Sequence, residues 1–404
     1  MSALSQKKIR VILDTDANNE IDDQHAIAYM LFSGDVFDVE GIVSNRTFNG
    51  GGVDRHTEEA QRVVDLCGCG DLIRVRSGAD KSYDEISDSV FASSFDGSGA
   101  VDLIIERAHA RDTRPLNVVA IGKLTNVALA LKKDPAIASK IRVVWLGSGP
   151  FDTSGGYNIN NDRACDLVDM EGLRAATVLL ADDVISAPPA EKQKRRGTGG
   201  LVYAFKVAGA KAETMANLDE VTRVAQKAAD ACHSIGMALT LCTVPQAGKP
   251  TFTLGDDEME IGMGIHGEPG VSRRKLESAE KIVGEMMDRL LADLPLTAKN
   301  RISVMVNSLG ATPPEELYIS YRHVKKAIEA TGATVVQPLV GRYATSMEMA
   351  GMTITCQRPR VQLRNTACHG FDGRGQSRQR PDSGFMVRCS RHAQGSDREN
   401  GFAG

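Results

Sequence analysis

Apolar and polar residues follow two different periodic patterns along the first 150 residues. Short, nearly continuous apolar runs typical of buried strands lie at 8–14, 38–44, 116–122 and 141–147. Between them, apolar residues recur every three or four positions, which predicts helices over 22–33, 53–68, 101–110 and 123–133. Strands that alternate with helices indicate a parallel, Rossmann-like sheet with helices on both faces. In such sheets a ligand binds at the carboxyl ends of the strands.

A second α/β pattern begins near residue 171. A predicted strand ends at Ala181-Asp182-Asp183, and the basic, Gly-rich turn KQKRRGTGG leads from it into a predicted helix over 200–213. A further predicted helix runs directly into His233. We interpret the charges of Lys192–Arg196 as a solvated basic loop rather than as a phosphate site. The pattern therefore predicts a second α/β domain.

The pattern ends near Cys356, where the composition changes. Residues 357–404 hold nine Arg, no Lys and four acids, with no periodicity and few aliphatic residues. Nucleic-acid binding is one interpretation of such a segment. We prefer a second one, out-of-frame translation of GC-rich DNA, because the change in composition is abrupt. Either way we expect a disordered tail, since it cannot bury enough apolar surface to offset its ordering entropy.

Composition narrows the classes of protein further. The 404 residues are enough for two or three domains, and 42% hydrophobic with 25% charged residues is typical of a globular protein. A net charge of −4 gives no general reason to expect nucleic-acid or membrane partners. The polar N-terminus lacks the apolar core of a signal peptide, and no apolar run approaches the roughly 18 residues of a membrane helix. Eight scattered cysteines are expected to be reduced, in a cytoplasmic protein.

Four carboxylates crowd the end of the first predicted strand. Asp14, Asp16, Asp22 and Asp23 all lie in the segment DTDANNEIDD. Carboxylates packed this tightly repel one another unless a cation neutralises them, and calcium takes oxygen ligands from such turns. A plainer interpretation is an acidic helix start, which the helix dipole favours.

This half resembles the nucleoside hydrolases of the inosine-uridine-preferring type, whose first strand ends in D-x-D-P-G-x-D-D. The resemblance implies that Asp16 and Asp23 bind calcium together with the carbonyl of Thr125, in the segment KLTN. It also implies that Asp22 is the general base that deprotonates the attacking water. These roles predict hydrolysis of an N-ribosyl bond.

Two further residues of this half match substrate contacts of the same family. Asn45 corresponds to an Asn that contacts the ribose, and Asn158 to the Asn of an E-F-N segment. The spacer Ala17–Ile21 is two residues longer than the family's, and Gly156-Tyr157 stands where Glu-Phe is usual. The sequence also contains no His-Asp step, which in the family supplies a calcium ligand and the leaving-group acid. General acid catalysis contributes about 10²–10⁴ in rate, so we expect weak or no turnover.

The stretch from His233, HSIGMALTLCTVPQAGKPTFTLGDDEMEIGMGIHGEPGV, resembles the substrate-binding (K) unit of dihydroxyacetone kinases. The resemblance extends over residues 171–356. It implies that His233 binds a short ketose such as dihydroxyacetone covalently, as a hemiaminal at the carbonyl carbon. A neutral imidazole nitrogen is nucleophilic enough for this addition. We interpret Asp256–Glu260 and His266 as loops around the substrate pocket rather than as a metal site.

The front portion of the K unit has no counterpart in this sequence. A Gly-rich loop of the type G-G-G-S-G-H-E-P is missing, together with a Lys and an Asp that orient the ketose. By resemblance, the phosphoryl donor would come from a separate L subunit that holds ATP and magnesium, or from a phosphotransferase relay. K units pair as dimers, which implies a homo-oligomer.

The leading hypothesis is therefore a fusion of two partial domains and a tail. A nucleoside-hydrolase-like domain spans 1–170, a K-unit-like domain 171–356 and the tail 357–404. The predicted function is ketose binding for phosphorylation, through His233. One alternative is a nucleoside hydrolase. The other is a partly folded fusion product without activity, because two halved cores would leave apolar faces uncovered.

Overall fold

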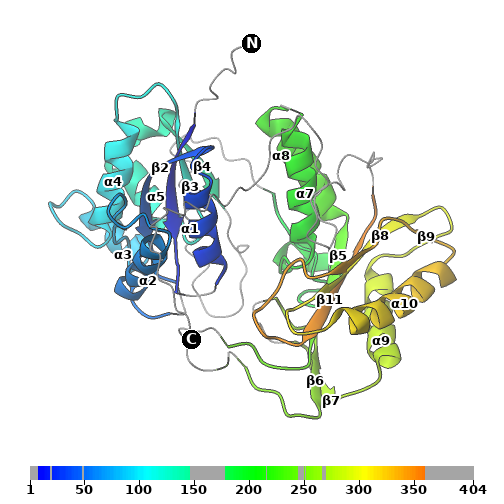
Figure 1. The fold of residues 1–404 in the computed structure, drawn as a ribbon. Helices are drawn as coiled ribbons and strands as arrows, with labels where there is room; N and C mark the ends of the chain where they lie inside the picture. The colour runs from blue at the N-terminus through cyan, green and yellow to red at the C-terminus, as the bar shows by residue number, and fades with distance from the viewer. Residues whose placement is uncertain are drawn as a thin grey trace, which may run out of the picture. The chain divides into compact units, whose positions relative to one another are not determined.

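The computed structural model describes residues 8–18, 21–47, 50–145, 178–214, 216–243, 250, 252–265 and 270–359. The described residues form an N-terminal part and a C-terminal part, each built around its own sheet (Figure 1). The predicted domain boundary near residue 170 and the tail beyond residue 359 lie outside the described residues.

The sheet of the N-terminal part has four strands in the order β2-β1-β3-β4. Their bounds are Ile9–Thr15 (β1), Phe37–Ser44 (β2), Leu116–Ala120 (β3) and Ile141–Trp145 (β4). All neighbouring strands are parallel. The predicted parallel sheet is confirmed, and each strand lies within two residues of its predicted bounds.

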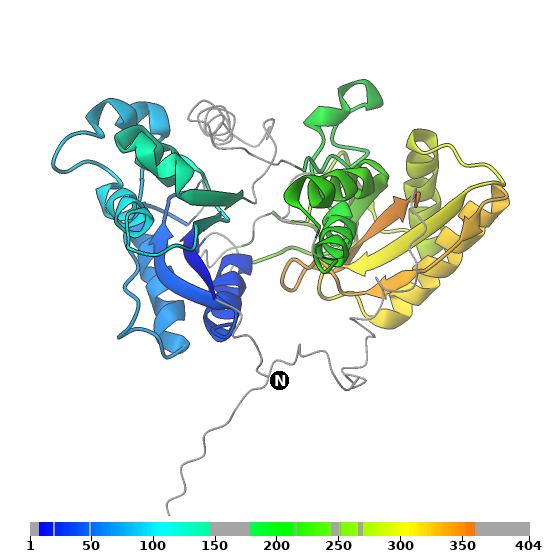
Figure 2. The same cartoon turned by 90° about the horizontal axis from the view of Figure 1, so that it is seen from above.

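Helices cover both faces of this sheet, as predicted (Figure 2). Their bounds are Asp22–Phe32 (α1), Val53–Leu66 (α2), Tyr83–Ile86 (α3), Ser98–Ala108 (α4) and Thr125–Lys133 (α5), with 3-10 turns at Ser87–Ser89 and Pro135–Ser139. Successive side chains of a strand point to opposite faces. Val11 and Leu13 therefore pack under α1 and α2, whereas Ile12 packs with α4 and α5 on the other face.

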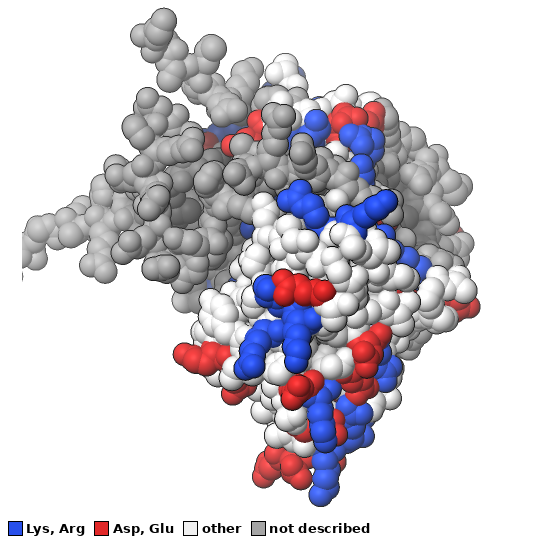
Figure 3. Space-filling model, turned by 90° about the vertical axis from the view of Figure 1, so that its right-hand side faces the viewer, with Lys and Arg blue, Asp and Glu red and all other residues white. Residues whose placement is uncertain are grey.

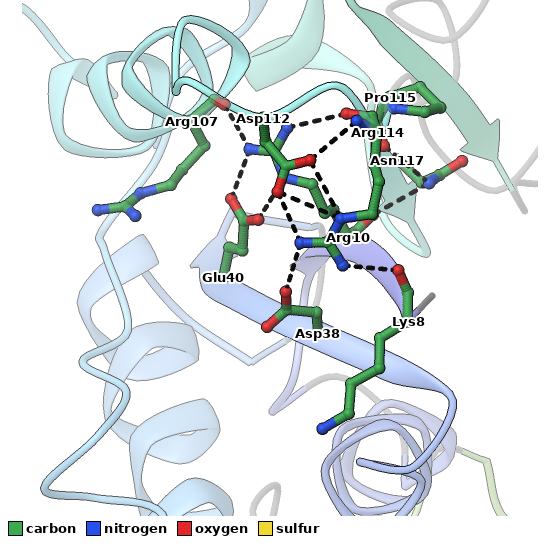
Figure 4. A network of polar contacts seen from close by, with 9 residues as sticks. All are labelled: Lys8, Arg10, Asp38, Glu40, Arg107, Asp112, Arg114, Pro115 and Asn117. Atoms are coloured by element: carbon green, nitrogen blue, oxygen red, sulfur yellow. Dashed lines mark hydrogen bonds and ion pairs between the residues drawn. The ribbon is translucent and has the colours of Figure 1, made fainter. Parts of the chain in front are cut away.

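A buried arginine joins the amino-terminal ends of these strands (Figure 4). Arg10 is 2% exposed, pairs with Glu40 on β2, and donates hydrogen bonds to the carbonyls of Arg107 at 2.7 Å and Arg114 at 3.1 Å. Arg114 in turn donates to Asp38 at 2.9 Å. The network fixes β1 against β2 and the end of α4, opposite the edge where parallel strands present ligand-binding loops.

The sheet of the C-terminal part has seven strands and is mixed. The strands are Cys232–Ala238 (β5), Glu258–Ile261 (β6), Ser272–Lys275 (β7), Arg301–Ser308 (β8), Thr334–Val335 (β9), Leu339–Gly341 (β10) and Gly351–Gln357 (β11). The order is β10-β8-β11-β5-β6-β7, and β9 also pairs with β8. Pairs with β9 and β10 are parallel and the others antiparallel.

Two layers of helices flank this second sheet. The helices are Gly200–Ala212 (α7), Leu218–Asp230 (α8), Ala279–Asp293 (α9) and Pro314–Ala330 (α10). Helices α9 and α10 pack on the face that carries Ile235 and Met237 of β5. On the opposite face, Tyr203 of α7 packs against Cys232 and Met305, and α8 lies along α7. The predicted second α/β domain is therefore observed.

Two local predictions were wrong. Residues 178–183, the described part of the segment that ends at Ala181-Asp182-Asp183, are not a strand, because they make a single bridge, from Asp183 to Ser234. Asp256–Glu260 was expected in a loop, but Glu258 to Glu260 belong to strand β6, where Glu260 is buried and pairs with Arg273 at 2.8 Å. The strand side chains therefore belong to the sheet rather than to a loop, and His266 lies outside the described residues.

The charges on the side of α10 are mixed in sign. Figure 3 shows Lys and Arg interspersed with Asp and Glu among uncharged residues, without a continuous patch of one sign on the described surface of this face. Ion pairs one helical turn apart join Arg289 to Glu285 on α9 and Lys325 to Glu329 on α10. Within the described ranges, no helix has the length and apolar character needed to cross a membrane.

Candidate functional sites

His233 lies at the point where helix α8 gives way to strand β5. The helix begins at Leu218 and ends at Asp230, and Asn217 caps its start by accepting a hydrogen bond from the Glu220 amide at 3.0 Å. His233 is the second residue of β5, so it shares a face with Ile235 and Met237. That face is covered by α9, and the His233 side chain is 12% exposed.

A carboxylate and a guanidinium lie behind the His233 ring. Nδ1 of His233 is 2.6 Å from Oδ2 of Asp293, the last residue of α9. Arg195 donates two hydrogen bonds to the same carboxylate, from Nη1 to Oδ2 at 2.9 Å and from Nη2 to Oδ1 at 2.7 Å. Its Nε donates to the carbonyl of Ala187 at 2.7 Å. The side chains of Arg195 and Asp293 are 1% and 8% exposed, so this cluster is nearly dry.

The electrostatics of the cluster favour a neutral ring. Burial lowers the pKa of His233 below its ordinary value, although Asp293 opposes this shift. For Asp293, burial alone would raise the pKa, but the hydrogen bonds from Arg195 and His233 lower it. An ionised carboxylate can only accept hydrogen bonds, so Nδ1 of His233 carries the ring proton. Nε2 then has a free electron pair.

The basic segment before α7 is folded into this cluster. Residues Pro189–Lys194 form a 3-10 helix, and Arg195 is buried, so the prediction of a solvated loop was wrong for Arg195. Arg196 pairs with buried Asp183 at 2.7 Å and donates to the carbonyl of Gly262 at 2.9 Å. Burial raises the pKa of Asp183 to about 6, and Arg196 counteracts the rise. Both arginines therefore hold the segment against the sheet.

Asp182 supports the other face of β5. It is fully buried and accepts hydrogen bonds from the amides of Thr198 at 2.8 Å and Gly200 at 2.7 Å, and from the hydroxyl of Ser234. The carboxylate thus satisfies amides at the start of α7, where the helix dipole favours negative charge. A Cβ on Gly199 would lie 2.0 Å from Oγ1 of Thr355, so the Gly-Gly pair allows this close approach.

The sequence-predicted residues of the N-terminal part gather at the carboxyl ends of β1, β2 and β3. Asp14 is fully buried and accepts hydrogen bonds from Nδ2 of Asn45 at 2.7 Å and Nδ2 of Asn126 at 3.0 Å. Burial raises the pKa of Asp14 to about 7, although both amides oppose the rise. The structure thus brings together Asp14 and Asn45, and adds Asn126, which also donates to the carbonyl of Ser44 at 2.9 Å.

The residues implied as calcium ligands are not grouped as a cluster of three acidic, His or Cys side chains in the described part of the chain. Calcium takes six to eight oxygens, several from ionised carboxylates. Burial raises the pKa of Asp16 to about 6, and Oδ1 of Asp23 accepts a hydrogen bond from the hydroxyl of Thr15. Thr125 begins α5 with its hydroxyl buried and unbonded. Across the described ranges, no three His, Cys, Asp or Glu side chains are grouped to hold a metal.

Two neighbours add to this mismatch. Asp22, the implied general base, is exposed at the start of α1. Lys123 brings its own positive charge to the acids: burial lowers its pKa, and Asp16 and Asp14 counteract this. The calcium prediction therefore stays a prediction, and no catalytic step is derived from it. Asn158 lies outside the described residues.

Sequence reasoning missed Asp293 and Arg195. Asp293 stands at the end of an ordinary amphipathic helix, and Arg195 stands in a run of basic residues. The position of Asp293 was the available signal, because a carboxylate at the carboxyl end of a helix is unfavourable without a partner.

Comparisons with known proteins match both parts of the chain. The family model for the Dak1 domain matches residues 154–369, and the model for inosine-uridine preferring nucleoside hydrolase matches residues 11–164. The chain is 39% identical over 228 residues to the dihydroxyacetone-binding subunit DhaK of PTS-dependent dihydroxyacetone kinase 2 of Listeria innocua. That match covers 56% of this chain and 68% of the relative.

Two further relatives are matched over smaller shares of their own length. The dihydroxyacetone-binding subunit DhaK of the PEP-dependent dihydroxyacetone kinase of Escherichia coli is 38% identical over 221 residues, which cover 49% of this chain and 62% of the relative. D-erythrulose kinase of Mycolicibacterium smegmatis is 38% identical over 221 residues, 54% of this chain and 38% of that enzyme. The chain thus joins a nucleoside hydrolase domain to a Dak1 domain, and it belongs to the Dak1 family.

Proposed function

We propose that this chain binds a short ketose such as dihydroxyacetone covalently through His233, as the substrate-binding component of a ketose kinase. The observation that carries the proposal is His233, whose side chain is 12% exposed and whose Nδ1 lies 2.6 Å from Oδ2 of Asp293; burial lowers the pKa of this ring. The names of the relatives, a dihydroxyacetone-binding subunit and an erythrulose kinase, support the same substrate class. A small polar ketose offers little surface for ordinary binding, so a covalent bond is a suitable way to retain it.

The proposed addition is balanced in atoms and charge. The electron pair of Nε2 attacks the carbonyl carbon of the ketose, and the carbonyl π pair becomes a lone pair on oxygen. The ring gains a positive charge, and the oxygen takes a proton from water. Nδ1 keeps its proton and its hydrogen bond to Asp293, and the hydroxide left by that water takes a proton from solvent, so formation of the hemiaminal takes up one proton. Reversal of the same steps releases the ketose.

Phosphoryl transfer is proposed to need a second protein. The relatives include subunits of kinases whose names state dependence on PEP or on the phosphotransferase system. We infer that a separate L subunit with ATP and magnesium, or a phosphotransferase relay, supplies the phosphoryl group. Homo-oligomer formation and a cytoplasmic location remain predictions of the sequence.

Intact-protein mass spectrometry tests the proposal. The chain is incubated with dihydroxyacetone, desalted without borohydride and weighed beside two variants. We expect the native chain to gain the mass of one ketose and His233→Ala to gain none. His323→Ala, a half-buried histidine on α10, is the matched control and should behave like the native chain. Equal mass gain in His233→Ala, or none in the folded native chain, would contradict the proposal.

A second candidate is nucleoside hydrolysis by the N-terminal part. It is favoured by the Asp14, Asn45 and Asn126 cluster and by the match to the hydrolase family. We expect weak or no turnover, because Asp22 is exposed and the sequence has no His-Asp step. Ribose release from inosine and uridine, with and without calcium, measures this. Efficient calcium-dependent release that Asp22→Asn abolishes would overturn the expectation.

A further inference from the structure

The proposed function leaves the charged pair behind His233 unexplained. We propose that Asp293, fixed by Arg195, is a positioning residue that sets the tautomer of His233 and stabilises the positive charge of its ring during ketose addition. The inference rests on the proposed function, because it concerns how the same histidine reacts. Neither residue needs to touch the ketose for this role.

The location of Asp293 indicates a tertiary role. It is the last residue of α9, a helix without a basic residue in its last turn. A carboxylate there faces the negative end of the helix dipole, which disfavours it. Its partners are remote in sequence, with His233 60 residues and Arg195 98 residues away. The cluster is therefore assembled by the fold and is not a local helix cap.

Arg195 fixes the orientation of the carboxylate. Its guanidinium contacts both oxygens of Asp293 at 2.9 and 2.7 Å, while its Nε is held by the Ala187 carbonyl. A planar fork bound at both ends of a carboxylate leaves the carboxylate little freedom to rotate. Oδ2 consequently stays directed at Nδ1 of His233. With the carboxylate ionised, the Nδ1–H tautomer is the one that makes this hydrogen bond.

The tautomer matters because the two ring nitrogens have different tasks. Only the nitrogen without a proton can attack the carbonyl carbon, and the Asp293 bond assigns that task to Nε2. When the Nε2–carbon bond forms, the ring becomes cationic inside a nearly dry cluster. A charge-assisted hydrogen bond from Nδ1 to Asp293 stabilises that cation. Without Asp293, two tautomers would compete and the ring charge would be uncompensated.

Nitrogen NMR on the full chain labelled with ¹⁵N-histidine tests the tautomer directly. The His233 signals are assigned by their loss in His233→Ala. We expect the native chain without ketose to show a protonated Nδ1 and an unprotonated Nε2, and Asp293→Ala to show a mixture of tautomers. The matched control is Asp288→Asn, an exposed residue of the same helix, which should leave the His233 signals unchanged. A protonated Nε2 in the native chain would overturn the proposal regardless of the variants.

The extent of adduct formation gives a second readout. We expect Asp293→Ala and Arg195→Gln to reduce the apparent affinity for dihydroxyacetone about 10- to 100-fold, the value of a hydrogen bond to a charged group. Asp293→Glu, which keeps the carboxylate, should restore part of the loss. Circular dichroism confirms that each variant is folded. Unchanged affinity and tautomer in folded Asp293→Ala would overturn the positioning role. Absence of an adduct in the native chain with an intact Nδ1–H tautomer would instead contradict the proposed function.

Discussion

At the scale of single residues, buried charges in both parts are held by particular partners. Asp293 is matched by Arg195, Asp183 by Arg196 and Arg10 by Glu40. Removing one member of a buried pair leaves the other charge buried without a partner. The resulting loss in the free energy of unfolding is far larger than the contribution of the pair itself. These residues are therefore sensitive points for both stability and function.

The pH dependence of ketose binding follows from the environment of His233. Only the neutral ring adds to the carbonyl, and burial lowers the pKa of His233 below the ordinary 6.5. As pH falls, the neutral form therefore persists to lower pH than in a free histidine. We expect the rate of adduct formation to fall with a midpoint below pH 6.5. A midpoint above pH 6.5, in a rate followed by mass spectrometry across pH, would contradict this.

The same argument predicts a shift in Asp293→Ala. The hydrogen bond and charge of Asp293 raise the pKa of His233, so their removal leaves burial to lower it further. The midpoint of the His233 titration, followed by NMR, should move to lower pH than in the native chain. A midpoint that moves upward would show that Asp293 does not act on the ring electrostatically.

A double-mutant cycle tests the Arg10 network. Arg10→Met leaves the carboxylate of Glu40, whose side chain is 13% exposed, without its partner, and it should reduce the free energy of unfolding by about 3–5 kcal/mol. Arg10→Met with Glu40→Leu should recover part of this loss, because no charge remains unpaired. Urea unfolding measures both. A loss in the double variant equal to the sum of the losses in Arg10→Met and in Glu40→Leu alone would mean that the pair is not coupled.

At the scale of elements, the sequence pattern identified the strands β1 to β4 and the helices α1, α2, α4, α5, α7 and α8, but not the strands of the second sheet. Runs such as 8–14 and 116–122 became β1 and β3 because alternating or continuous apolar residues can be buried on the two faces of a parallel sheet. The prediction of a strand before Asp183 was wrong for a topological reason. In the folded sheet β11, a distant strand, pairs along the whole of β5, and β6 pairs only with Met237 and Ala238. Residues 178–183 therefore pair with β5 through a single bridge, from Asp183 to Ser234.

Candidate sites were less predictable than elements. His233 and the N-terminal acids stand in recognisable motifs, so they could be named from the sequence. The Asp293 and Arg195 cluster could not, because a charge partner 98 residues away is selected by tertiary packing. For the same reason, the burial of Arg195 was not visible in a basic run.

Two glycines of the α7 region should respond in opposite ways to alanine. A Cβ at Gly199 would meet Oγ1 of Thr355 at 2.0 Å, so Gly199→Ala must displace backbone or β11 and should destabilise by about 1–3 kcal/mol. Gly209, inside the helix, has no atom near its absent Cβ. Gly209→Ala should stabilise by up to about 1 kcal/mol, through helix propensity. Thermal melting of both variants checks the pair, and a stabilising Gly199→Ala would refute the packing described.

At the scale of the whole molecule, each described part has its own sheet and core. The N-terminal core lies on both faces of the parallel sheet, and the C-terminal core lies chiefly between β5, β8, β11 and helices α9 and α10. The hypothesis of a partly folded product predicts broad, non-cooperative melting. We instead expect cooperative unfolding of the C-terminal part, visible as a sharp transition that ketose binding moves to higher temperature.

Phosphorylation should depend on a partner. The sequence lacks the K unit's Gly-rich front loop, and the chain covers 68% of its Listeria relative. We expect no ketose phosphate from this chain with ATP and magnesium alone. Product formed after addition of a purified ATP-binding L subunit, detected by phosphorus NMR, would identify the partner class. Phosphorylation by the purified chain alone would contradict the proposed division of labour.

The most direct test of the central claim observes the bond itself. Dihydroxyacetone labelled with ¹³C at the carbonyl carbon is added to chain labelled with ¹⁵N-histidine, and carbon–nitrogen coupling is measured by NMR. The account predicts a one-bond coupling between the ketose carbon and Nε2 of His233, which disappears in His233→Ala. Labelled ketose that shows only its free carbonyl and hydrate signals in the presence of the folded chain would contradict it.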